Sequence, residues 1–363
     1  MYLSRYVFPV ITLALSVVIA QDMPTVKSND LSRTLITPIL DTEIKPDQNL
    51  IYCATFQLAW NELRDSFPWH QPEDPEIIKQ LDKKMFVKDY LSEDCYVAMS
   101  GTWKNIAKKI NRILKEKFGD EAWPLTRERV LEDRFTENAL MAYAFLFKDL
   151  VFKTMFESLD EPILFDSQGK SVEAEGFGIK EFMPDEEKHK NLGKQVSIYY
   201  YNVDYTKRYW PEFVIELKPE SSNEEIIIAQ ISPKKTLLET IRNTQEIIAS
   251  NKPDSLREDE TVQIPKFDFD IEHNFTEIEN NLASLVMGPV KAYQRIKFGL
   301  NEKGAVLKSE AIILIEELIM ARRFIVSKPF LIYLKQKDSP YPYFAIWVEN
   351  EEILVEKQIK KGR

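Results

Sequence analysis

The sequence is poor in the residues that build most metal and redox sites. Its 363 residues include three histidines and two cysteines. None of the histidines (His70, His189 and His273) has a second histidine or a cysteine at metal-ligand spacing. The chain also lacks a nucleophile elbow, a phosphate-binding P-loop and a HExxH helix. These absences predict no metal site and no cofactor, and they give no sign of an enzyme.

Basic residues are also in deficit, since the formal net charge is −10 and the pI is about 5.2. Binding to nucleic acid needs a basic surface that neutralises phosphates, so we expect no nucleic-acid partner. Glycine and proline are not enriched, which excludes collagen-like and disordered classes. A hydrophobic content of 44% is enough to fill the core of a large soluble domain, and we expect a monomer.

Long hydrophobic runs without charges are missing after the first twenty residues. Arg5 precedes an apolar stretch at 7–19, and the small residue Ala20 stands at a suitable cleavage point. This pattern predicts a signal peptide over 1–20 and a secreted, extracellular mature chain with no membrane span. The alternative is a single membrane anchor, for which the apolar stretch is short.

Export gives the two cysteines two interpretations. Cys53 and Cys95 either form a disulfide in an oxidising compartment or remain buried thiols that act as small hydrophobic residues. The same context makes Asn274 a glycosylation site, because Asn274-Phe275-Thr276 is a sequon.

Hydrophobic periodicity predicts an α+β fold, with helices early and strands late. We expect an extended lead-in over 21–48, one domain over 49–355 and a basic tail over 356–363. The expected helices are 49–64, 102–119 and 233–251, and the expected strands are 195–205, 211–219, 224–231, 262–275 and a hairpin over 328–350. Residues 139–165 fit a helix or a strand equally well.

The helix at 102–119 is the one local basic face on an acidic chain. Its basic side chains include Lys104, Lys108, Lys109, Arg112 and Lys115. Such a face suits a sulfated polysaccharide or another anionic surface, and the alternative is an ordinary solvated helix face. A second charged pattern, the row Asp268, Asp270 and Glu272, lacks the turn glycine of a calcium loop and indicates a solvated strand face.

Three stretches in order resemble the serpin family. They are "VQIPKFDFDIEHNF" (262–275), "KAYQRIKFGLNEKG" (291–304) and "SKPFLIYLKQKDSPYPYFAIWVEN" (327–350), and the resemblance covers roughly 138–355. It implies one serpin-like domain with a large central β-sheet, N-terminal helices and a C-terminal pair of strands. It also implies an exposed segment between Gly304 and Lys328.

In inhibitory serpins a serine protease cuts this exposed loop and is trapped when the loop inserts into the sheet. The resemblance therefore implies a reactive-centre loop over 305–325. Its hinge consists of Glu302, Gly304, Ala305, Leu307 and Ser309, and its scissile bond is Leu318–Ile319, with Arg322 and Arg323 as further cleavage points. Alternation from Ala305 gives one face that is small or apolar, as an inserting strand requires.

A non-inhibitory serpin-like scaffold, binding a ligand or a partner, is the rival hypothesis. Leu307 and Lys308 are large where the inserting strand needs small residues, and overpacking costs about 1–3 kcal/mol. The segment 308–323 also has apolar residues at helical spacing, so it could be a packed helix instead of a loop.

Overall fold

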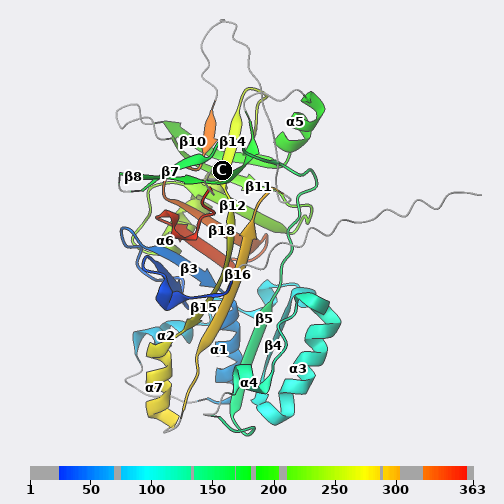
Figure 1. Ribbon diagram of the computed structural model, residues 1–363, viewed down its shortest axis with the longest axis vertical. Helices are drawn as coiled ribbons and strands as arrows, with labels where there is room; N and C mark the ends of the chain where they lie inside the picture. Colours follow the sequence, from blue (N-terminus) through cyan, green and yellow to red (C-terminus); the bar gives the residue numbers. More distant parts are fainter. Residues whose placement is uncertain are drawn as a thin grey trace, which may run out of the picture.

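The computed structural model describes residues 24–68, 75–131, 135–167, 169–180, 185–203, 211–286, 289–302 and 322–357. The predicted signal peptide and most of the predicted basic tail lie outside these residues. The chain has the predicted α+β class, with a large multi-stranded sheet and several helices (Figure 1).

The largest sheet has eight strands in the order β13-β10-β11-β12-β18-β19-β3-β2. Their bounds are β13 Asp254–Ser255, β10 Val196–Val203, β11 Pro211–Leu217, β12 Glu224–Gln230, β18 Phe330–Gln336, β19 Phe344–Val348, β3 Asn49–Cys53 and β2 Thr34–Thr37. All pairs are antiparallel except β2 with β3. The predicted C-terminal strand pair is thus confirmed, and it lies between β12 and β3 in the middle of the sheet.

Two small sheets run from the middle to the bottom of the view in Figure 1. One has the order β1-β15-β16, with β1 Val26–Lys27, β15 Phe267–Asn274 and β16 Tyr293–Leu300, and the other pairs β4 Tyr96–Thr102 with β5 Leu140–Leu146. Within the described residues, the ladder of β16 ends at β15 and that of β5 ends at β4. The large sheet is therefore continuous, whereas these two sheets are not hydrogen-bonded to each other.

The remaining strands form a four-stranded sheet and a hairpin. The sheet has the order β17-β14-β9-β6, and the hairpin is β7-β8. Their bounds are β17 Arg323–Ile325, β14 Thr261–Pro265, β9 Gly176–Ile179, β6 Glu157–Ser158, β7 Ile163–Ser167 and β8 Lys170–Ala174.

The helices obey local sequence rules. They are α1 Thr55–Ser66, α2 Glu76–Leu81, α3 Trp103–Phe118, α4 Arg127–Val130, α5 Glu186–Gly193, α6 Leu237–Ser250 and α7 Thr276–Val286, with 3₁₀ turns at Ser28–Asp30, Lys88–Tyr90, Glu93–Cys95, Gly119–Glu121 and Glu351–Ile353. The predicted helix 102–119 is confirmed as α3, which ends at Gly119 in the left-handed half of backbone space (φ 55°). The predicted helix 233–251 starts at Leu237, because Thr236 and Glu239 form a capping box there.

Two secondary-structure predictions are wrong in part. Residues 49–53 are not the first turn of a helix but strand β3, paired on both sides, because hydrogen bonding within the sheet overrides the helical spacing. The predicted strand 262–275 is broken at Lys266, whose N–H donates to the Glu175 carbonyl at 2.8 Å. The ambiguous segment 139–165 contains strands, not a helix.

The N-terminal segment is extended but is built into the sheets. β1 runs parallel to β15, and β2 runs parallel to β3. Glu352, near the end of the described chain, accepts hydrogen bonds from the backbone N–H groups of Ser32 and Arg33 and from the Thr34 hydroxyl. Residues near the two ends of the described chain are therefore hydrogen-bonded to each other beside β2.

Candidate functional site

The predicted reactive loop lies mostly in residues 303–321, outside the described residues. This range includes Gly304, Ala305, Leu307 and Ser309 of the predicted hinge and the predicted scissile pair Leu318–Ile319. The loop and helix alternatives for 308–321 therefore lie outside the described residues, whereas Arg323, the last residue of the alternative helix, belongs to strand β17. The two residues that flank 303–321, Glu302 and Arg322, are described, and both are anchored.

The first anchor is an ion pair between Glu302 and Lys266. Lys266 Nζ lies 2.7 Å from Glu302 Oε2 and donates to Ser158 Oγ at 2.6 Å. The Lys266 carbonyl accepts a hydrogen bond from the Val355 N–H at 3.1 Å. The ion pair thus joins the residue after β16 to Lys266, which lies between β14 and β15. Val355, after the last 3₁₀ turn, is hydrogen-bonded to the same residue.

The second anchor is Arg322, which is paired with two acidic side chains. Its Nε donates to Glu260 Oε1 at 2.5 Å, and its NH2 group lies 2.8 Å from Asp254 Oδ2. Glu260 is fully buried and is shared with Arg257 at 3.1 Å. The Arg322 guanidinium is therefore occupied by ion pairs within the protein. This disfavours it as the specificity residue for a trypsin-like protease, which must bind that group itself.

Arg323 is held through its backbone. It opens β17, in parallel register with Thr261 of β14, and its N–H donates to the Tyr201 hydroxyl at 3.2 Å. A protease needs this stretch as a free extended chain, so the ladder also disfavours cleavage at Arg323. Lys266 holds the first anchor, and Thr261 pairs with the residue after the second anchor. These two residues are five positions apart, which at about 3.3 Å per residue separates the anchors by about 16 Å.

An inserted strand of the kind that the sequence resemblance implies would pair with the free edge of β16 in the described structure. We use "connector" for residues 119–131, which join α3 to the segment before β5. The indole of Trp123 in the connector lies edge-on to Phe145 of β5, with ring centroids 6.1 Å apart. The Arg295 guanidinium of β16 lies 4.1 Å from the centre of the same indole. Trp123 thus contacts both of the strands whose facing edges are unpaired in the described structure.

Arg295 is the centre of this contact. It donates to both carboxylate oxygens of Asp270, at 2.8 and 2.6 Å, and to Thr25 Oγ1 at 2.9 Å. The hydrogen-bonded carboxylate of Asp270 raises the pKa of the Arg295 guanidinium above its ordinary value. Asp270 is only 3% exposed, so the prediction of a fully solvated acidic strand face is wrong at this residue.

The connector is fixed on both sides. On the α3 side, Asn111 exchanges two hydrogen bonds with the backbone of Leu125, at 2.7 and 2.8 Å. On the β16 side, Lys291 Nζ donates to the Arg129 carbonyl at 3.3 Å. Sequence reasoning missed this arrangement, and the signal for it was one large aromatic residue within the polar stretch "GDEAWPLTRERV".

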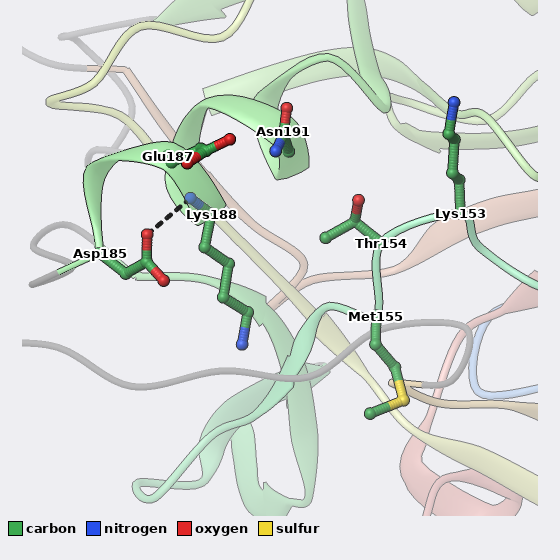
Figure 2. Close-up of a pocket in the computed structure, with 7 residues that line it drawn as sticks. All are labelled: Lys153, Thr154, Met155, Asp185, Glu187, Lys188 and Asn191. Atoms are coloured by element: carbon green, nitrogen blue, oxygen red, sulfur yellow. Dashed lines mark hydrogen bonds between the residues drawn. The ribbon is translucent and has the colours of Figure 1, made fainter.

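A shallow pocket of about 440 Å³ lies between α5 and residues 153–155 (Figure 2). Its seven lining residues are Lys153, Thr154, Met155, Asp185, Glu187, Lys188 and Asn191. Asp185 accepts from the Lys188 N–H as the helix cap, and the Lys188 ammonium pairs with Glu157. The lining mixes charges of both signs and brings together none of the residues predicted as functional sites.

Of the two interpretations for Cys53 and Cys95, the structure shows free thiols and no disulfide. Burial raises the pKa of both thiols, and for Cys95 the nearby Lys148 ammonium opposes that shift. Two free thiols fit the alternative interpretation, in which the cysteines act as small hydrophobic residues. Asn274 of the sequon is exposed at the end of β15.

The predicted basic face lies on the outside of α3. Its five members are all exposed, and the opposite face of the helix is buried through Trp103, Ile106, Ile110 and Leu114. Lys104 Nζ donates to Asn138 Oδ1 at 2.6 Å, and Arg112 lies 3.8 Å from Glu116.

The described part of the chain has neither a cluster of metal-ligand residues nor a helix suited to cross a membrane. No group of three or more histidine, cysteine, aspartate or glutamate residues there could hold a metal ion. No helix among the described residues has the length and apolar character needed to cross a membrane.

The chain was compared with protein-family models, with curated proteins and with solved structures. No protein-family model matches the chain, and no curated protein matches it. The chain is similar in structure to thyroxine-binding globulin in its complex with thyroxine, at 11% sequence identity and a TM-score of 0.41. The match covers 84% of this chain and 94% of that chain. These values are too low to transfer the ligand of that protein to this one.

Proposed function

We propose that this chain is a serpin-like binding scaffold whose 303–321 segment can be cut by a protease without trapping it. The proposal rests on the sequence resemblance and on where the resembling stretches lie. The first stretch forms β14 and β15, the second forms β16, and the third forms β18 and β19. Two of them flank the anchors of the 303–321 segment.

Trp123 is the observation that favours a non-inhibitory scaffold over an inhibitor. Insertion of a cut loop would need the edges of β5 and β16 that carry no partner strand among the described residues. Trp123 touches Phe145 and Arg295, which belong to these two strands, so an inserting strand would have to displace it.

Displacing the connector has an energetic cost that an inserting strand must meet. A cation–π contact contributes about 0.5–2 kcal/mol, and an aromatic pair adds about 0.5–1.5 kcal/mol. The two hydrogen bonds between Asn111 and Leu125 oppose the same movement. Leu307 adds about 1–3 kcal/mol if it overpacks the sheet. Trapping is a race against release of the protease, so these costs favour release.

The test is incubation with a panel of serine proteases, followed by denaturing gels. We expect cleavage within 303–321 without a covalent band at the combined mass. We also expect the thermal midpoint to stay unchanged on cleavage, because no new strand joins the sheet. A covalent adduct, or a midpoint that rises on cleavage, would contradict the proposal.

The variant Trp123→Ala sharpens this test, with Trp123→Phe as its matched control. If the connector alone prevents insertion, cleavage of the alanine variant raises the thermal midpoint while cleavage of the phenylalanine variant does not. If neither cleaved variant gains stability, the large residues at Leu307 and Lys308 are sufficient to prevent insertion.

We also propose that the chain is secreted. This follows from the predicted signal peptide over 1–20 and is consistent with an exposed Asn274 in its sequon. Expression in a eukaryotic secretory host, with mass analysis of the medium, tests both points. The expected product begins at Gln21 and loses mass on removal of N-linked glycans.

A further inference from the structure

The pocket between α5 and residues 153–155 is built from residues outside the three stretches that resemble the serpin family (Figure 2). Its volume of about 440 Å³ falls within the range of small-molecule sites. Its lining residues also take no part in the two anchors of the 303–321 segment or in the contacts of Trp123. The sequence resemblance therefore does not explain this pocket.

Hydrogen bonds and an ion pair hold the two walls of the pocket together. Gln195, just after α5, is buried, and its amide exchanges two hydrogen bonds with the backbone of Thr154, at 2.6 and 2.8 Å. In the first turn of α5, the Lys188 ammonium pairs with the buried carboxylate of Glu157. A ligand would therefore enter a preformed site and lose little affinity to reordering of the protein.

Two charged side chains of the lining are not used by the described part of the fold. Glu187 of α5 and Lys153 are exposed, and neither has a hydrogen bond or an ion pair with another described residue. Figure 2 shows them on opposite sides of the pocket. The pocket thus offers a negative group on one wall and a positive group on the other.

An apolar side chain stands on the same wall as Lys153. Met155 is 50% exposed, although its chain neighbour Phe156 is buried. A ligand that covered the Met155 thioether would remove apolar surface from water, which favours binding in proportion to the area buried. The wall formed by 153–155 therefore suits the part of a ligand that combines a negative charge with an apolar group.

We infer that this pocket binds a short linear zwitterion, with an ammonium group at one end and a carboxylate beside an apolar group at the other. The ammonium pairs with Glu187, the carboxylate with Lys153 and the apolar group with Met155. A dipeptide and an ω-amino acid share this chemistry. An α-amino acid carries both charges on one carbon and suits opposite walls less well. The inference rests on the proposed scaffold function, for which it names a ligand class.

Calorimetry at low salt, with ligand-observed NMR as a second readout, measures binding of alanyl-leucine and of 6-aminohexanoate. Three ligand controls each lack one feature. N-acetyl-alanyl-leucine has no ammonium, alanyl-leucine amide has no carboxylate, and leucine has both charges on one carbon. We expect each control to bind at least about fivefold more weakly than alanyl-leucine, since an exposed ion pair contributes up to about that factor. The tighter of the two zwitterions identifies the source of the ligand.

Matched variants test the assigned side chains. Glu187→Gln and Lys153→Gln each remove one charge of the lining. Glu186→Gln and Lys190→Gln remove the same charges from exposed positions of α5 outside the lining, and Glu186 shares the first turn and the helix dipole with Glu187. We expect the lining variants to bind alanyl-leucine about fivefold more weakly and the control variants to bind it like the unmodified chain. The Lys153→Gln variant should bind the peptide and its amide equally, because the partner of the carboxylate is gone.

Four results would overturn the inference. They are no binding of either zwitterion, equal binding of alanyl-leucine and its acetylated or amidated form, equal weakening by the lining and control variants, and tighter binding of leucine than of both zwitterions. None of these results changes what the protease gels show. Conversely, a covalent adduct on the gels would contradict the proposed function and would leave the calorimetry of the pocket as measured.

Discussion

The eight-stranded sheet and the pair of small sheets differ in how they are held together. In the large sheet every neighbouring pair of strands is joined by backbone hydrogen bonds, and strands such as β18 and β19 are buried along nearly their whole length. The small sheets meet at edges that are unpaired in the described residues, where Trp123 makes side-chain contacts to both. Backbone hydrogen bonds hold the strands of the large sheet together, whereas side-chain contacts such as those of Trp123 join the two small sheets to each other.

Matched tryptophan substitutions in the two regions should give the largest contrast. Trp347 of β19 is fully buried, and its indole N–H donates to Glu349 at 2.8 Å. We expect Trp347→Ala to lower the free energy of unfolding by about 3–5 kcal/mol, because it leaves a large cavity. Denaturant unfolding followed by circular dichroism measures this loss. A loss below that of Trp123→Ala would reverse the comparison.

The junction between the ends of the chain should show the next largest effect. Asn49 is fully buried, and its amide donates to Asn350 Oδ1 at 2.7 Å and accepts from the N–H groups of Glu349 and Asn350. Asn49→Ala leaves several buried groups unpaired, so we expect a loss of about 2–3 kcal/mol in the free energy of unfolding. Asn105→Ala on exposed α3 is the control and should change it little. Equal losses in both variants would show that the buried network contributes nothing specific.

Removing the indole of Trp123 should lower the free energy of unfolding by a smaller amount. We expect Trp123→Ala to lower the free energy of unfolding by about 1–2 kcal/mol, since the indole is half-buried and loses one cation–π contact and one aromatic contact. Limited trypsin digestion should then cut faster after Arg127 and Arg129, because the connector is less firmly held. Unchanged digestion would indicate that Asn111 and Lys291 hold the connector without the indole.

Acid should produce the smallest of these effects, through the buried His189 and the half-buried His273. Burial lowers the pKa of His189 and of His273 below the ordinary value. The unfolded chain therefore binds more protons than the folded chain below a pH of about 6.5, so stability falls as the pH drops through that range. Above it both states are neutral at these residues, and stability does not change on their account.

Urea unfolding at pH 7.5 and pH 5.5 measures the acid effect. In the variant His189→Gln, the difference between the two urea midpoints should shrink. Glu157 acts in the opposite direction, because burial raises its pKa above the ordinary value, and it remains constant between the two proteins. An unchanged difference in the variant would contradict the assignment to His189.

Hydrophobic patterns within single segments correctly predicted those helices and strands whose conformation depends mainly on their own residues. The stripe of Trp103, Ile106, Ile110 and Leu114 was enough to predict α3, and alternating or β-branched runs predicted β10, β11, β12, β18 and β19. The helical spacing of Phe56 and Trp60 was also correct. The same reasoning failed at 49–53, because a strand between two other strands takes its conformation from its neighbours.

The candidate site was predicted less completely than the fold. The sequence pointed to Glu302, Arg322 and Arg323 as loop residues, but it could not assign their partners Lys266, Glu260 and Tyr201, which lie 36 to 122 residues away. It also predicted a solvent-exposed Asp270, which is in fact buried. Alternation shows which residues share one face of a strand, but it does not show what covers that face.

The sequence by itself determined the α+β class, the exposed basic face of α3 and the strands that flank the 303–321 segment. All of these follow from the period of apolar residues within one element, which the backbone imposes locally. Only the tertiary structure decided that Trp123 contacts side chains of both β5 and β16 and that Arg322 is bound to a buried carboxylate. Those contacts join residues far apart in the chain, and their energies exist only after the sheets have been brought together.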